Sequence, residues 1–201
     1  MSVREARIGR LLTACLHQAI VDEIPQRLDF YEVWLGADAL RDRGAGMAPM
    51  SAVLGFLRTE RAYRQVVTRA GRLAAEWTVS SMSPLERRLI GMLPRRWRAR
   101  AALRVVARIV RDVCSLSRAS ARVRKTSARL AVTGSLFCTV REPQPLPLCE
   151  FYVAAATEIL AVFHLPARAR VDTCLAVDGA LCVIALDLAG SDVAADPAAA
   201  A

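Results

Sequence analysis

The feature that most constrains the fold of this chain is a change in hydrophobic periodicity near residue 115. Before that point, apolar residues recur every three or four positions, as in Val66, Ala70, Leu73 and Trp77, which is typical of amphipathic helices. After it, short segments alternate apolar and polar residues, and proline or glycine separates them. The order is helices, two strands, one helix and two more strands. It predicts an α+β fold, in which an antiparallel sheet of about four strands is packed on one face by helices.

The boundaries of these elements follow from caps, prolines and turn residues. Ser83 followed by Pro84 indicates a helix start, because serine caps a helix and proline suits its first position. Asp178 followed by Gly179 predicts a tight hairpin turn between two strands. The predicted helices cover about 8–24, 51–57, 60–77, 84–93, 95–114 and 149–163, and the predicted strands cover 119–126, 130–140, 169–177 and 181–188.

The length of 201 residues fits one domain that can bury a core without a metal or a disulfide. Within it we expect a helical N-terminal region over residues 1–60 and a ligand-binding region over residues 61–188. The apolar periodicity stops after about residue 188, so residues 189–201 are predicted to be a disordered tail.

The net charge of +9 comes almost entirely from arginine, since Lys125 is the one lysine. Such a balance is typical of a GC-rich genome, and it also suits a carboxylate ligand or an anionic membrane surface. The arginines lack the interleaved exposed aromatics of single-strand binders and no recognition-helix motif is present, so no nucleic-acid partner is expected. Neither a signal peptide nor an apolar run of about 18 residues is present, which predicts a cytoplasmic protein with at most peripheral membrane contact. In that compartment the six cysteines are expected to be free thiols.

The segment from Leu148 to Leu188 has a distinctive order. A cysteine and aromatic residues open a helix, a proline ends it, and a strand closes on Thr173 and Cys174. A turn with Asp and Gly follows, and then a strand that contains Cys182. This order resembles the vinyl-4-reductase domain, a small-molecule-binding fold related to the small subunits of the TRAPP tethering complex.

The stretch 92–108, with Met-Leu-Pro-Arg-Arg-Trp and the arginine-rich helix after it, is similar to one branch of that family. The branch belongs to bacteriochlorophyll biosynthesis and carries the label divinyl-protochlorophyllide 8-vinyl reductase. The resemblance covers roughly residues 61–188. Where the family often has a Trp-His pair, this chain has Phe151 and Tyr152, so one axial ligand for a metallated ring is missing.

The resemblance implies a tetrapyrrole-binding protein, which acts as a substrate carrier or accessory factor at the 8-vinyl reduction step. One alternative is an 8-vinyl reductase that takes electrons from an external reductant, and another is a TRAPP-like dimeric interaction module. The residues show no GxGxxG turn, no iron–sulfur cysteine cluster and no nucleophile–base pair, so catalysis stays open and no catalytic residue is predicted. No resident cofactor is predicted, and a magnesium tetrapyrrole would be bound as ligand. The expected partners are this hydrophobic ligand, a second copy of the chain, or pigment-biosynthesis enzymes.

The candidate ligand-binding side chains are aromatic, arginine and cysteine residues of the resembling region. The aromatic rings could line a pocket for a flat ring or pack in the core, and the arginines could hold a propionate or form a solvated helix face. The predicted set is Trp77, Trp97, Arg104, Arg108, Phe137, Cys149, Phe151, Tyr152, Cys174 and Cys182.

Metal binding is a separate hypothesis for some of these residues. Cys174 and Cys182 flank the predicted turn, and together with Cys149 or Cys138 they could bind zinc, contact a ligand, or simply fill the core. His164 at a helix end could ligate a ring metal or interact with the helix dipole.

Overall fold

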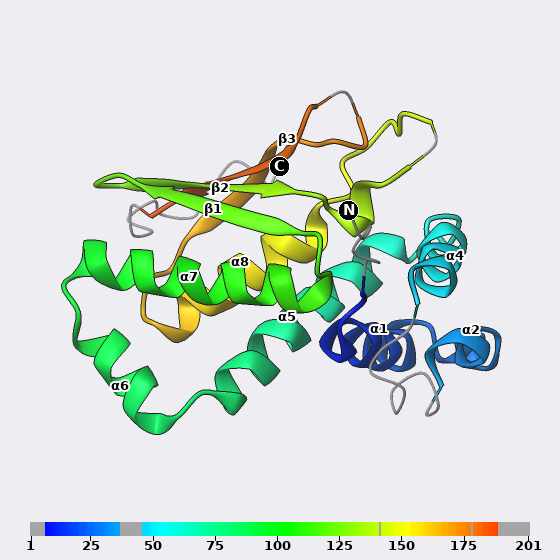
Figure 1. Ribbon diagram of the computed structural model, residues 1–201, viewed down its shortest axis with the longest axis horizontal. Coiled ribbons are helices and arrows are strands. Elements are labelled where there is room, and N and C mark those ends of the chain that lie inside the picture. The colour runs from blue at the N-terminus through cyan, green and yellow to red at the C-terminus, as the bar shows by residue number, and fades with distance from the viewer. Residues whose placement is uncertain (1–6, 37–45, 141, 178, 189–201) are drawn as a thin grey trace, which may run out of the picture.

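The structure is a computed structural model that describes residues 7–36, 46–140, 142–177 and 179–188 (Figure 1). The predicted α+β class is confirmed, because helices lie beneath one face of a four-stranded antiparallel sheet. The helices are α1 (Arg10–Glu23), α2 (Leu28–Leu35), α4 (Met47–Leu57), α5 (Tyr63–Ser81), α6 (Pro84–Met92), α7 (Arg95–Val113) and α8 (Glu150–Val162). The strands are β1 (Arg118–Val123), β2 (Ser127–Thr133), β3 (Arg168–Thr173) and β4 (Cys182–Asp187), and Pro25–Arg27 and Leu136–Cys138 form short 3-10 helices.

The strand order β1-β2-β4-β3 places β2 and β4 in the middle of the sheet. These two strands are antiparallel, and Leu130 lies opposite Ile184. Both residues are buried, whereas Arg129 and Ala185 on the other face are more accessible. This alternation is the period-2 pattern of a sheet that is covered by helices on one side only.

The helix layer is built on α5 and α8, which cross closely. A Cβ atom added at Gly71 of α5 would lie 2.3 Å from the carbonyl oxygen of Phe151 in α8, so only glycine fits at this crossing. α7 packs against β1, and α1 packs on the side of α5. Buried side chains from Ile8 to Leu188 belong to one hydrophobic cluster, so the N-terminal helices share a core with the sheet.

Most predicted helices are found near their expected bounds. The serine cap is confirmed, since Ser83 Oγ accepts a hydrogen bond from the backbone N–H of Glu86 at 3.1 Å. α4 begins at Met47 rather than at Ser51, because Gly46 and not the serine occupies the position before its first turn. No helix of the described ranges is long and apolar enough to cross a bilayer.

Two strand boundaries were predicted wrongly. The strand predicted over 130–140 ends at Thr133, because Gly134 takes a left-handed conformation with φ +65° and turns the chain into the 3-10 helix. The strand predicted over 169–177 ends at Thr173, which pairs with Val183 of β4. The predicted turn at Asp178–Gly179 includes Asp178, which lies outside the described residues, as does the predicted tail.

Candidate metal centre and adjoining pocket

Four buried cysteines bring their sulfur atoms together at one end of the sheet, and we call them the thiol centre: Cys138, Cys149, Cys174 and Cys182. All four Sγ atoms lie within 4.8 Å of one another. The Sγ atom of Cys138 is 3.3 Å from that of Cys149, 3.6 Å from that of Cys174 and 3.4 Å from that of Cys182. The Sγ atoms of Cys149 and Cys174 are 3.3 Å apart.

Each thiol comes from the end of a different element. Cys138 closes the 3-10 helix after β2, Cys149 precedes the first turn of α8, and Cys182 is the first residue of β4. Cys174 follows β3, and its carbonyl oxygen accepts hydrogen bonds from the backbone N–H groups of Val177 and Gly179. These bonds turn the chain at the end of the strand, and they explain why the loop folds back toward the other cysteines.

The geometry suits one tetrahedral metal ion better than a disulfide. A disulfide would need a sulfur–sulfur distance of about 2.05 Å. Four thiolates around zinc, each about 2.3 Å from the ion, would have sulfur–sulfur edges of about 3.8 Å. Four of the sulfur–sulfur distances are 3.3–3.6 Å, which is close to that tetrahedron and far from a covalent bond. Sulfur is also the donor that zinc and other soft ions prefer.

Mutual hydrogen bonding makes one of the four sulfurs acidic. Hydrogen bonds with Cys138 and Cys149 lower the pKa of Cys182 to about 3. The hydrogen bond with Cys138, followed by that with Cys182 and by burial, raises the pKa of Cys149. The lowered pKa makes Cys182 the thiolate of the centre, and a bound cation would favour deprotonation of the other thiols as well.

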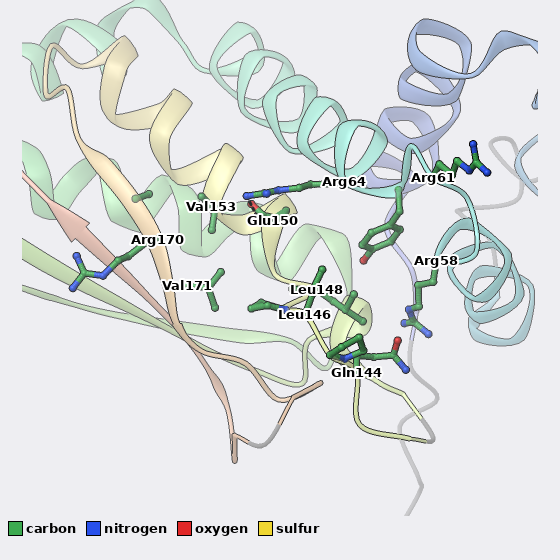
Figure 2. A pocket seen from close by; sticks show the side chains of 14 residues that line it. Arg58, Arg61, Arg64, Gln144, Leu146, Leu148, Glu150, Val153, Arg170 and Val171 are labelled. Carbon is green, nitrogen blue, oxygen red and sulfur yellow. Dashed lines mark ion pairs between the residues drawn. The ribbon is translucent and has the colours of Figure 1, made fainter. Parts of the chain in front are cut away.

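Next to the thiol centre lies a cavity of about 570 Å³, which we call the Arg58 pocket (Figure 2). Its walls come from the end of α4, the start of α5, the proline-rich loop before α8, the first turn of α8 and strand β3. The lining residues are Arg58, Arg61, Tyr63, Arg64, Gln144, Pro145, Leu146, Pro147, Leu148, Glu150, Val153, Ala169, Arg170 and Val171.

Two polar atoms of lining residues are buried without a hydrogen-bond partner. They are Arg58 Nε and the hydroxyl group of Tyr63. Burial raises the pKa of Tyr63, although the nearby Arg58 cation opposes this, so the phenol remains a neutral donor. Buried donors normally have partners, and leaving one unpaired costs about 1–3 kcal/mol. A bound molecule that brings an acceptor to these two atoms would remove this cost, once a side-chain shift exposes them to the cavity.

The other charged lining residues are paired with each other or point away from the cavity. Arg64 Nη2 lies 2.9 Å from Glu150 Oε1, and Figure 2 shows this pair side by side. Arg61 and Arg170 point away from the cavity in the same view. Among the ion pairs found in the described ranges, none joins a carboxylate to Arg58. Arg58 is consequently the cation that a ligand anion would meet.

Hydrogen bonds connect the pocket wall to the thiol centre. Arg58 Nη2 donates to the carbonyl oxygens of Phe137 at 2.9 Å and Thr139 at 3.3 Å, the two neighbours of Cys138. The backbone N–H of Leu148 donates to Cys174 Sγ at 3.4 Å. Movement of the thiols would thus move both the cation and the apolar wall of the pocket.

The sequence-predicted site residues fall into three groups. Cys149, Cys174 and Cys182 meet in the thiol centre, together with Cys138. Phe137, Phe151 and Tyr152 are fully buried and pack on one another, with ring centroids 4.7 Å apart for the two phenylalanines. A third group lies outside the Arg58 pocket, on exposed helix surface or at a helix end: Trp77, Trp97, Arg104, Arg108 and His164.

Ligand contact by the second and third groups stays a prediction. Arg108 forms an ion pair with Glu86 at 3.2 Å, and Arg104 is exposed. His164 follows the C-cap residue of α8 with a positive φ of 55°, and it lies at the surface. Sequence reasoning missed Arg58 and Tyr63, because neither lies in a recognisable motif. The run of prolines at 143, 145 and 147 was the one local signal of a rigid pocket wall.

Comparison with known proteins adds little to this geometry. No family model matches the chain, and no curated protein matches it. Among solved structures, a mutant H-NOX domain from Shewanella oneidensis, determined by NMR in the Fe(II)CO ligation state, is similar over 90% of this chain and 98% of that chain. The sequence identity is 13% and the TM-score is 0.48, a likeness too weak to carry a functional conclusion. The resemblance to the vinyl-4-reductase domain stays a prediction.

Proposed function

We propose that this chain is a small-molecule-binding protein that holds an acidic, largely apolar ligand in the Arg58 pocket. The observation that carries the proposal is the pair of buried, unpartnered donors, Arg58 Nε and the Tyr63 hydroxyl, at a cavity of about 570 Å³. Cavities of about 300–1,000 Å³ with a few convergent polar groups are typical of ligand sites.

A carboxylate is the group that best matches these donors. It accepts hydrogen bonds only, and a bond from a guanidinium to a carboxylate is charge-assisted and stronger than a neutral one. Part of the lining is apolar, including Leu146, Leu148 and Val171, so we expect the ligand to have a hydrophobic part that packs there.

We also propose that the thiol centre binds one zinc ion with a structural role. Four protein thiolates complete the coordination of zinc and leave no position for a substrate, which is the pattern of structural sites. The ion would fix the ends of β3, β4 and α8 and thereby the pocket wall that Leu148 contributes. In this proposal, zinc maintains the binding site and takes no part in chemistry.

The tetrapyrrole implied by the family resemblance is one member of this ligand class, since a propionate-bearing ring is both apolar and acidic. A carrier role at the 8-vinyl reduction step of bacteriochlorophyll biosynthesis is the most specific form of the proposal. That form is supported by the resemblance alone, whereas the ligand class is supported by the pocket.

The proposal is tested by titrating the purified protein with 1-pyrenebutyrate, followed by fluorescence, and with protoporphyrin and divinyl protochlorophyllide, followed by absorbance. We expect saturable binding of at least one acid at about one per chain, with a Kd of about 10 μM or lower. Tyr63→Phe removes one donor and should weaken binding about five- to tenfold. Tyr152→Phe is the matched control, because its hydroxyl is also buried and unpartnered but does not line the pocket.

The three titrations test the ligand class and the tetrapyrrole role separately. Binding of pyrenebutyrate without either pigment would keep the ligand class and remove the tetrapyrrole role. No saturable binding of any of the three acids would contradict the proposed function, as would an equal effect of Tyr63→Phe and Tyr152→Phe.

A further inference from the structure

Helix α6 exposes apolar side chains that no part of the described chain covers. The helix has no buried residue. Leu85 is 66% exposed, Leu89 52% and Met92 66%, and their spacing of four and three residues places them on one face of the helix. Glu86 lies toward α7, where it pairs with Arg108. Figure 1 shows α6 at the margin of the molecule, with α7 between it and the sheet.

The apolar stripe continues past the end of α6. Leu93 is also exposed, and Trp97 in the first turn of α7 is 56% exposed. The guanidinium carbon of Arg100 lies 5.1 Å from the centre of the Trp97 ring, a cation–π arrangement. We call Leu85, Leu89, Met92, Leu93 and Trp97 the α6 face.

The sequence of α6 and α7, which carry this face, is strongly basic. Between Ser83 and Arg111 the sequence contains nine arginines and one acidic residue, Glu86, which is already paired. Arg87 and Arg88 on α6 are exposed, as are Arg96 and Arg104 on α7. Arg95 and Arg98 are engaged with backbone carbonyls of Leu188 and Gly91, so they are not counted in this exposed set.

We propose that the α6 face docks on an anionic membrane surface. An amphipathic helix that combines leucine and tryptophan with arginine is the usual chemistry of proteins that lie in the lipid interface. The apolar residues would enter the acyl boundary while the arginines contact lipid phosphates.

Two other occupants fit the face less well. A second copy of this chain would bring the arginines of both copies together, and like charges at an interface disfavour association. Five exposed apolar side chains are also a small area beside the roughly 800 Å² that each partner buries in a standard interface. An acidic protein would match the charge, but charge attraction alone would not account for the exposed leucines and tryptophan.

The test is flotation of the full chain with vesicles of phosphatidylcholine alone and with vesicles that contain about one-third phosphatidylglycerol. We expect binding to the anionic vesicles only, and a clear decrease when the salt is raised from 0.1 M to 0.5 M. The double variant Leu89→Ser with Met92→Ser should weaken binding at least about tenfold, because the bound protein would bury two fewer apolar side chains in the lipid. The control Leu116→Ser changes a leucine of equal exposure, 52%, in another part of the surface, and it should bind normally.

A second pair of variants tests the charge. Arg88→Gln with Arg96→Gln should weaken binding about tenfold or more, at about 1 kcal/mol for each arginine near an anionic surface. Arg122→Gln with Arg124→Gln, which removes two exposed arginines elsewhere, should have little effect. The proposal is overturned if the chain binds neither kind of vesicle, or if the α6 variants bind anionic vesicles as well as their controls do. If no vesicle binds and these variants lose self-association or binding to an acidic polypeptide, the face belongs to a protein partner instead.

Discussion

At the scale of single residues, the thiol centre is built from four cysteines that belong to different elements of the fold. Cys138, Cys149, Cys174 and Cys182 lack the paired spacing of a common zinc site, so the sequence favoured packing in the core over zinc binding. Their convergence depends on the left-handed Gly134 after β2 and on the turn that forms at the carbonyl oxygen of Cys174. Both are backbone details that tertiary packing decides, which is why the sequence did not reveal them.

The thiol centre gives a prediction about metal content. Protein purified without added chelator should contain about one zinc per chain, and Cys182→Ser should lose most of it because three thiolates bind zinc more weakly than four. Elemental analysis measures the zinc content of the wild type and of Cys182→Ser, and thiol titration counts the free cysteines in each. Cys15→Ala is the control, since Cys15 is buried outside the centre and burial raises its pKa to about 12. Equal zinc content in the wild type and Cys182→Ser would show that the thiols hold no metal.

A second residue-scale prediction concerns Asp112. Burial raises its pKa above the ordinary value of 3.8, although Arg111 and Arg108 oppose the rise. A raised folded-state pKa means that this carboxyl favours folding below its unfolded pKa and loses that contribution as pH rises through the folded value. Asp112→Asn should therefore be more stable than the wild type at pH 7, by less than about 1 kcal/mol because the site is accessible to solvent.

Denaturant unfolding at pH 7 and near pH 3 would measure this effect. The stability difference between Asp112→Asn and the wild type should shrink at the lower pH, where the wild-type carboxyl is protonated. A difference that grows on acidification would contradict the assignment.

At the scale of elements, periodicity was sufficient for the long helices and for the existence of four strands. α7 and α8 were predicted almost to the residue, because their apolar stripes end at clear breaks. The strand ends were not, since Thr133 and Thr173 are followed by turns that no proline or Asp-Gly pair marks at those positions. The pocket depends on those ends: the loop after β3 accepts a hydrogen bond from Gln144, and it carries Cys174.

The crossing of α5 and α8 provides a test of the helix layer. Gly71→Ala should destabilise the protein by about 1–3 kcal/mol, because the new Cβ would lie 2.3 Å from the carbonyl oxygen of Phe151 and the helices would have to separate. Gly55→Ala in α4 meets no atom within 4 Å, so it should be neutral or stabilising by up to about 1 kcal/mol. Thermal unfolding of both variants makes the comparison, and equal behaviour would mean that the two helices do not cross this closely.

At the scale of the whole molecule, one core joins the N-terminal helices to the sheet, and the Arg58 pocket lies where α4, α5, α8 and β3 meet. For the aromatic residues the sequence left both pocket lining and core packing open, and Phe137, Phe151 and Tyr152 pack on one another in that core. The Arg58 pocket is more polar than a cavity lined by those aromatic rings would be, and its buried donors come from Arg58 and Tyr63. The pocket thus joins residues 58–64 to residues 144–171, which lie far from them in the sequence.

Zinc and ligand are expected to be coupled through the pocket wall. Removing zinc with a chelator should weaken binding of 1-pyrenebutyrate several-fold, because Leu148 and the backbone held by Arg58 both depend on the thiol centre. Restoring zinc should restore the affinity. Unchanged affinity in the metal-free, still folded protein would show that the two sites are independent.

The measurement that most directly tests the proposed function compares an acid with its own ester. Binding of 1-pyrenebutyrate and of its methyl ester shares every apolar contact and differs in the carboxylate. The arrangement of Arg58 and Tyr63 predicts that the acid binds at least about tenfold more tightly, and that Tyr63→Phe narrows this difference. If acid and ester bind equally, the pocket does not recognise a carboxylate and the proposed ligand class is wrong.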